Sequence, residues 1–121
     1  MKNIMILVST LLFTNIAIAN EEQLIEDPKM VAELNVIQIS LDNVFTSVMA
    51  CIESGGEHTN CLCQNKDVIT KFNDSVYSFF ERNDHMKNAG LVRFKAEDGN
   101  WVTQSLQGIL KQANSDEPHC H

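Results

Sequence analysis

Four cysteines, at positions 51, 61, 63 and 120, constrain the fold of this chain more than any other feature. An even number of cysteines in a short exported chain is typical of a disulfide framework. Pairing Cys61 with Cys63 would close a very small, strained ring, so two connectivities are left. Either Cys51 bonds to Cys61 and Cys63 to Cys120, or Cys51 bonds to Cys63 and Cys61 to Cys120. Both connectivities tie the C-terminus to the segment that follows Cys51.

The N-terminus has the layout of a secretory signal peptide. Lys2 precedes an apolar run over residues 4–13, and Ala17-Ile18-Ala19 is a small-x-small cleavage pattern. The run is too short for a confident membrane span, and no second apolar stretch of spanning length is apparent. We therefore predict a signal peptide over residues 1–19 and one mature domain over residues 20–121. That domain is expected in a periplasm or outside the cell, without stable membrane insertion.

The charge balance argues against one class of partner. Loss of Lys2 with the signal peptide leaves eight basic and sixteen acidic residues, a net charge of −8. The basic residues are scattered and form no stripe. An acidic surface repels the phosphates of nucleic acids and anionic lipid headgroups. Nucleic-acid binding is therefore not expected, and we attribute the acidity to solubility.

A long helix is predicted over residues 28–53, after an acidic and irregular segment over residues 20–26. Asp27 is suited to cap this helix, and Pro28 suits its first position. Gly55-Gly56 ends it. Apolar residues recur at helical spacing and form one broad stripe, at positions 30, 31, 34, 37, 41, 44, 45, 48, 49 and 52.

The opposite side of this helix carries no charged residue. One interpretation is that the helix is central, with other elements packed on both sides. The other is that this side is a partner surface or a dimer surface, because a solvated face normally carries charges. Ser47 is among the uncharged residues on this side of the helix. The second interpretation makes five of its residues a candidate interaction face: Ala32, Val36, Ile39, Asn43 and Ala50.

A second helix is predicted over residues 65–86, after a polar loop over residues 57–60. Asn65 is suited to cap this helix. The short link and the complementary apolar stripes predict an antiparallel helical hairpin. The stripe of the second helix comprises Val68, Ile69, Phe72, Val76, Phe79, Phe80 and Met86.

The periodicity changes after residue 90. Residues 91–96 alternate between apolar and polar, and Asp98-Gly99 favours a two-residue hairpin turn. That turn would place Ala96 opposite Trp101 and would put Trp101 on the face that covers the helices, with Val92, Phe94 and Ala96. A short third helix follows over residues 105–113. The predicted fold is therefore mainly α with a minor β part: a helical hairpin, a two-stranded β-hairpin, a short C-terminal helix and two disulfides.

The C-terminal tail suggests metal chemistry. His119-Cys120-His121 carries imidazole and thiol groups, which are good ligands for zinc and copper. A bridge to Cys120 would bring the tail near His58, so His58, His119 and His121 form a candidate metal site. Oxidation of Cys120 would remove its thiolate from that site, and the ligand spacing matches no established metal motif.

The motifs of common enzymes are missing, since the chain has no H-E-x-x-H, G-x-S-x-G, P-loop or G-x-G-x-x-G pattern. We therefore favour a small exported binding or interaction protein over an enzyme, and we predict no catalytic residue and no cofactor. Its partner would be another protein, a second copy of the chain or a small ligand. The alternatives are zinc or copper binding through the tail and carriage of a small apolar ligand between the helices.

Overall fold

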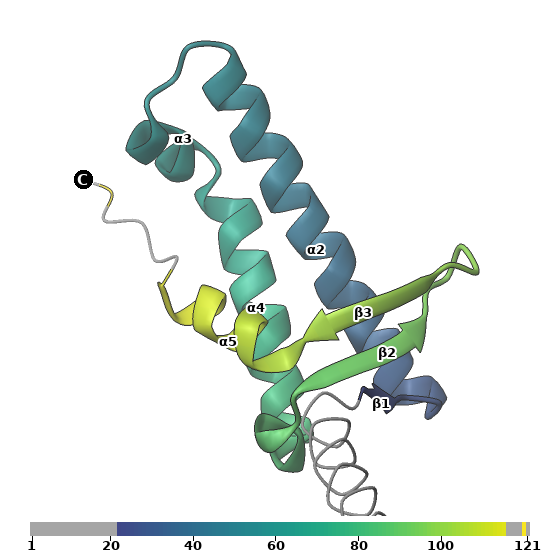
Figure 1. Ribbon diagram of the computed structural model, residues 1–121. Helices are drawn as coiled ribbons and strands as arrows, with labels where there is room; N and C mark the ends of the chain where they lie inside the picture. The colour runs from purple at the N-terminus through teal and green to yellow at the C-terminus, as the bar shows by residue number, and fades with distance from the viewer. Residues whose placement is uncertain (1–21, 116–119, 121) are drawn as a thin grey trace, which may run out of the picture.

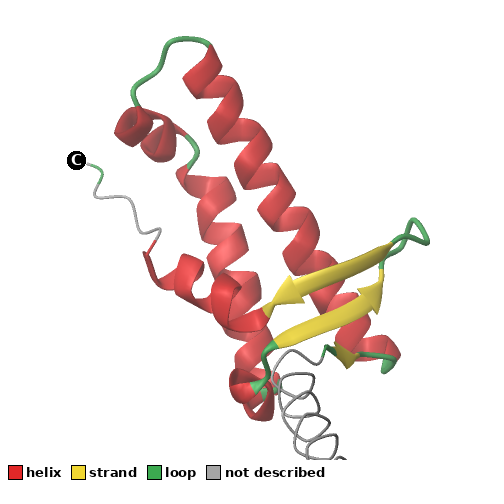
Figure 2. Cartoon of the chain, viewed as in Figure 1, coloured by secondary structure: helices red, strands yellow, loops and turns green. Residues whose placement is uncertain are grey.

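The computed structural model describes residues 22–115 and Cys120, and it has the mainly helical fold that the sequence predicts. Two long helices, α2 (Pro28–Glu53) and α4 (Lys66–Arg82), lie side by side and antiparallel (Figure 1). A small sheet and a short helix cross one side of this pair (Figure 2). The predicted signal peptide lies outside the described residues.

Helix α2 has the bounds that the sequence predicts. The Asp27 carboxylate caps it by accepting a hydrogen bond of 3.1 Å from the Met30 backbone N–H, and Pro28 occupies the first turn. At the other end, the chain leaves the helix at Ser54. Gly55 then adopts a φ of 96°, a conformation that a residue with a Cβ rarely adopts.

The link between the two long helices contains a short helix, α3 (His58–Gln64), where the sequence predicted a polar loop over residues 57–60. The prediction was wrong because a helix of this length has no apolar repeat that could reveal it. Asn65 occupies the N-cap position of the following helix as predicted, but its side chain makes no capping hydrogen bond. Its side-chain amide instead donates a hydrogen bond of 2.8 Å to the Cys61 carbonyl oxygen, which satisfies a backbone group at the end of α3.

Helix α4 ends four residues earlier than predicted, at Arg82, and a 3₁₀ helix, η1 (Asp84–Asn88), follows it. The Asn83 side-chain amide donates to the Phe79 carbonyl oxygen over 2.9 Å, and so closes the last turn of α4. Met86 is nevertheless buried as predicted, because η1 folds it back onto the core.

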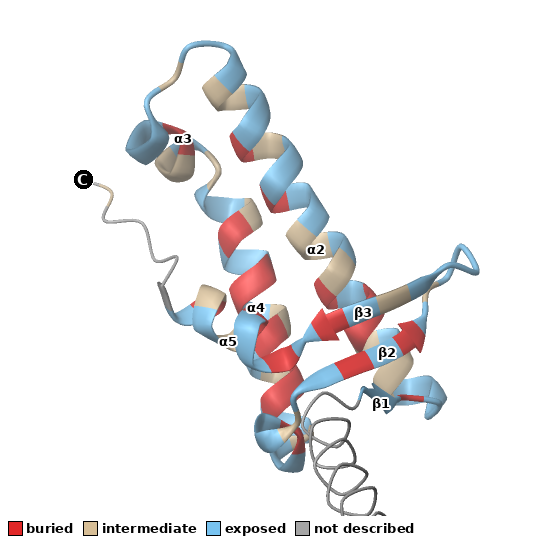
Figure 3. Ribbon diagram, in the orientation of Figure 1, coloured by how far each residue is buried: buried red, intermediate tan, exposed pale blue. Residues whose placement is uncertain are grey.

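The core lies between α2, α4 and the sheet, and buried positions cluster on the facing sides of these elements (Figure 3). Most of the predicted stripe of α4 is buried, while Val68 is half-buried. The buried residues of the two long helices include Leu34, Ile37, Val44 and Val48 of α2 and Ile69, Phe72, Val76, Phe79 and Phe80 of α4.

The predicted hairpin is present, but its register differs from the prediction by one residue. Strand β2 (Leu91–Lys95) pairs with β3 (Trp101–Ser105), so that Trp101 lies opposite Lys95 and not opposite Ala96. The loop has three residues, because Ala96 donates to the Asn100 carbonyl oxygen and Gly99 adopts a φ of 86°.

This shift moves Trp101 to the other face of the sheet. The Trp101 side chain is 52% exposed, and the Arg93 guanidinium lies 4.8 Å from the centre of its ring. Gln104 takes the inward position instead, and its side-chain amide donates to the Gln38 side-chain oxygen over 3.2 Å. Val92 and Phe94 are fully buried, as predicted.

A third strand, β1 (Gln23–Leu24), pairs in parallel with β2, in a segment that the sequence predicted to be irregular. The Ile25 backbone N–H continues this pairing with a hydrogen bond of 2.9 Å to the Arg93 carbonyl oxygen, and the Ile25 side chain is buried. Two residues are too few to show an alternating pattern, so only the tertiary pairing reveals this strand.

The third predicted helix, over residues 105–113, is α5 (Leu106–Ser115). It packs beside α4, and Leu106 is fully buried. The Tyr77 hydroxyl of α4 donates a hydrogen bond of 2.8 Å to the Asn114 side-chain oxygen. The C-terminal helix is thereby joined to the helical hairpin by both apolar and polar contacts.

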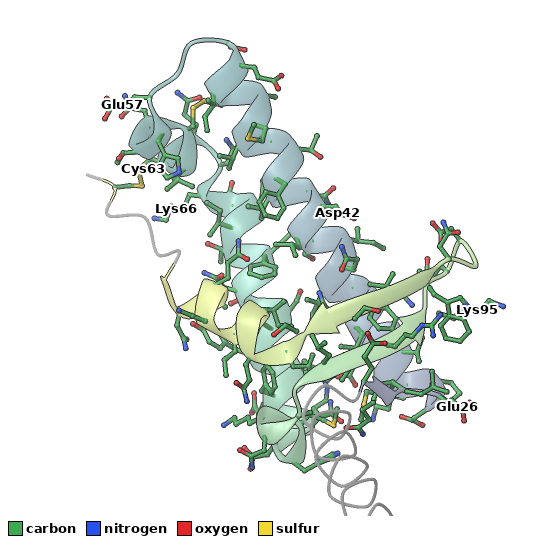
Figure 4. All side chains as sticks on the ribbon, in the orientation of Figure 1. Glu26, Asp42, Glu57, Cys63, Lys66 and Lys95 are labelled. Atoms are coloured by element: carbon green, nitrogen blue, oxygen red, sulfur yellow. A yellow bond between two sulfur atoms is a disulfide. The ribbon has the colours of Figure 1, made fainter. Side chains whose placement is uncertain are left out.

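The disulfides are Cys51–Cys61 and Cys63–Cys120, the first of the two connectivities that the sequence left open. Cys61 and Cys63 both lie on α3 (Cys63 is labelled in Figure 4). Two positions apart on a helix, their side chains point to nearly opposite sides, because each residue turns the helix by about 100°. One short helix therefore holds the end of α2 on one side and the C-terminal tail on the other.

Gly56 packs so closely against the Cys51–Cys61 bridge that it has no room for a side chain. A Cβ at this position would lie 2.6 Å from the Cys61 sulfur and 2.9 Å from the Cys51 sulfur. We expect Gly56→Ala to lower the free energy of unfolding by about 1–3 kcal/mol, the usual cost of overpacking. Urea denaturation of the oxidised protein would measure this loss.

Gly90→Ala is the matched control for this substitution, because a Cβ at Gly90 would meet no atom within 4 Å and its φ is not positive. We expect its free energy of unfolding to stay within about 0.5 kcal/mol of the wild type. Equal losses in both variants would show that the bridge does not restrict position 56.

Candidate interaction surface

The outward side of α2 is the strongest candidate for a functional surface. All five residues of the predicted interaction face are exposed, and Val36 and Ile39 are 54% and 51% exposed. The interpretation in which α2 is central, with elements packed on both sides, is wrong for the part of the chain that the structure describes. Both α4 and the sheet lie toward the inner side of the helix, and no described element covers the outer one.

The exposed residues of this side follow a regular spacing of four and three residues in alternation. They are Ala32, Val36, Ile39, Asn43, Thr46 and Ala50, and we call this set the α2 seam. The sequence pattern predicted Ser47 and not Thr46 on this side, whereas Thr46 is the more exposed of the two. The alternating spacing of the other members already pointed to Thr46.

Two carboxylates flank the α2 seam, and both have partners within the chain. Glu33 accepts from the Arg82 guanidinium at 3.3 Å and from the Asn83 side-chain amide at 3.2 Å. Asp42 accepts from the Gln38 side-chain amide at 3.1 Å and projects away from α4 (Figure 4). The seam itself is uncharged in a chain whose net charge is −7.

Two large apolar residues of α2 are exposed although the sequence placed them in the core stripe. Phe45 is 53% exposed and Met49 is 47% exposed. The sheet crosses only the N-terminal half of α2, so the C-terminal half packs against α4 without that second layer (Figure 1). The sequence could not show how far the sheet extends along the helix.

Helix α2 is also long and apolar enough to cross a membrane, judged by length and composition alone, contrary to the expectation from the sequence. Its inner face is part of the protein core, however, where Leu34 and Ile37 are fully buried. A core helix of a folded domain passes the same test. The apolar residues of α2 therefore lie partly in the core and partly on the α2 seam.

No known protein-family model, no curated protein and no solved structure matches this chain.

The predicted metal site stays a prediction, because two of its three histidines are not among the described residues. His58 is exposed at the start of α3, while His119 and His121 lie outside the described residues. Cys120 is bonded to Cys63, so it offers no thiolate. Among the residues that the structure describes, no group of three histidine, cysteine or acidic side chains could hold a metal ion.

The described residues line three surface hollows that bear on the carriage of a small apolar ligand. The first measures about 270 Å³, lies between α2 and α4, and is lined by Glu33, Val36, Asp74, Ser75, Ser78 and Arg82. Two others measure about 540 and 650 Å³, lie beside α4, η1 and α5, and share Lys87, Leu110 and Asn114. Sites for apolar ligands are mostly lined by apolar and aromatic side chains. Charged side chains line each of these hollows, and the largest also includes Tyr77 and Phe80, so carriage of an apolar ligand stays a prediction.

Proposed function

We propose that this protein is an exported, non-catalytic binding protein that docks a protein partner on the α2 seam. One observation carries the proposal: an exposed, uncharged helix face runs along α2 in an otherwise acidic protein. Two disulfides and the signal-peptide pattern over residues 1–19 support export, because structural disulfides persist in oxidising compartments.

The α2 seam shares one feature with the core of a protein interface, the absence of charged residues. Single exposed apolar residues are ordinary on protein surfaces. The seam differs because Val36 and Ile39 belong to a continuous uncharged row that extends about 27 Å along the helix, from Ala32 to Ala50. Depletion of charge is the feature that distinguishes the centre of a protein interface from the rest of the surface.

The shape of this surface favours a macromolecular partner over a small ligand. Apart from Val36, which also lines the hollow between α2 and α4, the seam residues line none of the hollows described above, and small ligands bind in concave sites. A partner helix can place its side chains between the ridges of α2 and bury Val36 and Ile39 together. Burial of apolar area would supply the driving force, at about 25 cal/mol per Å².

Photo-crosslinking in the producing cells tests this proposal. We expect p-benzoylphenylalanine in place of Ile39 to form a covalent adduct with a protein. Leu91 provides the control position, because it is also apolar and exposed but lies on the sheet, away from α2. Absence of an adduct from position 39, or equal adducts from both positions, would contradict the proposal. The mass of the adduct identifies the partner as a second copy or as another protein.

A further inference from the structure

We infer that the partner on the α2 seam is a second copy of this chain, with the two α2 helices packed in parallel about a two-fold axis. This inference rests on the proposed function and specifies its partner. Three features of the described residues support it: the spacing of the seam, the position of Asn43 within it, and the placement of the flanking carboxylates.

The α2 seam has the spacing of a two-stranded coiled coil. Successive members are 4, 3, 4, 3 and 4 residues apart, from Ala32 to Ala50. This repeat keeps one row of side chains facing a partner helix along its length. Two identical rows can face each other in full, because a two-fold interface uses the same patch on both copies.

The position of Asn43 selects the parallel orientation. In a parallel pair, Asn43 lies opposite Asn43 of the second copy, and the two side-chain amides can hydrogen-bond to each other. In an antiparallel pair centred on the seam, Asn43 lies opposite Ile39, and its amide loses water without gaining a partner. A single asparagine at this kind of position is a known determinant of two-stranded pairing.

The charges beside the seam favour the same orientation. In the parallel pair, Asp42 lies opposite Ser47 of the second copy, five residues further along. In the antiparallel pair, Asp42 lies opposite Asp42, so two carboxylates of like charge meet near the axis. Glu33 is held by Arg82 of its own chain in either case. The parallel arrangement therefore buries the uncharged row and separates the carboxylates.

The protein also supplies what a short coiled coil lacks on its own. An isolated coiled-coil segment must order its helix before it can pair, and helix nucleation is unfavourable. Here α2 is already capped by Asp27 and packed against α4. Pairing of two such helices does not incur the cost of ordering the backbone, so a short seam can suffice.

Sedimentation of the purified, oxidised protein over a range of concentrations tests whether the partner is a second copy of the chain. We expect a reversible dimer in the wild type and at least tenfold weaker dimerisation in Val36→Lys. Phe45→Lys is the matched control, because Phe45 is equally exposed on the same helix but lies outside the seam. It should dimerise like the wild type. Circular dichroism checks that each variant is folded, and Ile39→Gln provides a second seam variant without an added charge.

Crosslinking from position 32 tests the orientation. With p-benzoylphenylalanine in place of Ala32, a parallel dimer should give an adduct to the region of Ala32 in the second copy, whereas an antiparallel dimer would give one near Ala50. Cleavage after glutamate separates the two regions, because Glu33 lies between them. An adduct near Ala50 would overturn the parallel arrangement.

Several outcomes would overturn the second copy as the partner. The first is a wild-type protein that stays monomeric at all concentrations. The second is an equal weakening of dimerisation by Val36→Lys and by Phe45→Lys. The third is a monomer that binds phosphatidylglycerol vesicles and loses this binding in Val36→Lys. If Ile39 nevertheless forms an adduct with a different protein in cells, the proposed function stands and only this inference fails. If Ile39 forms no adduct at all, both fail.

Discussion

Replacing Phe79 by alanine is expected to lower the free energy of unfolding by about 3–5 kcal/mol. The Phe79 ring is fully buried, and it packs edge-on against the Phe80 ring with 5.2 Å between the ring centres. Its removal loses the transfer free energy of the ring and leaves a cavity that the surrounding helices fill only in part. Domains of this size are stable by only about 5–15 kcal/mol, so this one substitution threatens the fold.

Urea denaturation followed by circular dichroism, with the disulfides intact, measures the loss. Trp101→Ala is the control, because it also removes an aromatic side chain but from the exposed face of the sheet. Loss of its contact with Arg93 is expected to cost about 1 kcal/mol or less. If Trp101→Ala were as destabilising as Phe79→Ala, the hairpin register described above would be wrong.

Removal of the Cys63–Cys120 bridge, by replacing both cysteines with alanine, is expected to cost about 4 kcal/mol. The bridge joins residues 57 positions apart, so in the unfolded chain it closes a long loop. The Cys51–Cys61 bridge joins residues 10 positions apart, and the same chain-entropy relation gives about 3 kcal/mol for its loss. Both bridges act mainly by restricting the unfolded chain.

Equilibrium unfolding of the two double variants, each with its remaining bridge oxidised, measures these costs. Thiol titration under denaturing conditions should find no free cysteine in either variant, which confirms that no bridge has rearranged. A loss below 1 kcal/mol for the Cys63–Cys120 pair would show that the long loop is already restricted in the unfolded state.

The sequence predicted the helices well because their signals are local. Asp27-Pro28 marks the start of α2, and the apolar spacing of Phe72, Val76 and Phe79 marks the buried side of α4. The hairpin register failed because Asp98-Gly99 fits two loops, one of two residues and one of three with Gly99 in the left-handed conformation. A difference of one residue in the loop decides which face Trp101 occupies.

The candidate surface was predictable in its residues but not in its exposure. The uncharged row on α2 can be read directly from the positions of Val36, Ile39 and Asn43. Whether other elements cover that row depends on where the sheet packs, which is a non-local property of the fold. The same holds for Phe45 and Met49, whose helical positions indicate the core although the sheet does not extend to them.

The placement of both bridges on α3 has a consequence for the order in which they can form. Chains are synthesised and folded from the N-terminus, and Cys120 follows Cys63 by 57 positions. Cys51 and Cys61 are thus available to each other long before Cys63 can meet its partner. Because α3 turns Cys63 to the side away from Cys61, early formation of the helix would keep the waiting thiol clear of the first bridge. Helix α3 therefore holds Cys63 apart from the Cys51–Cys61 bridge until Cys120 reaches it.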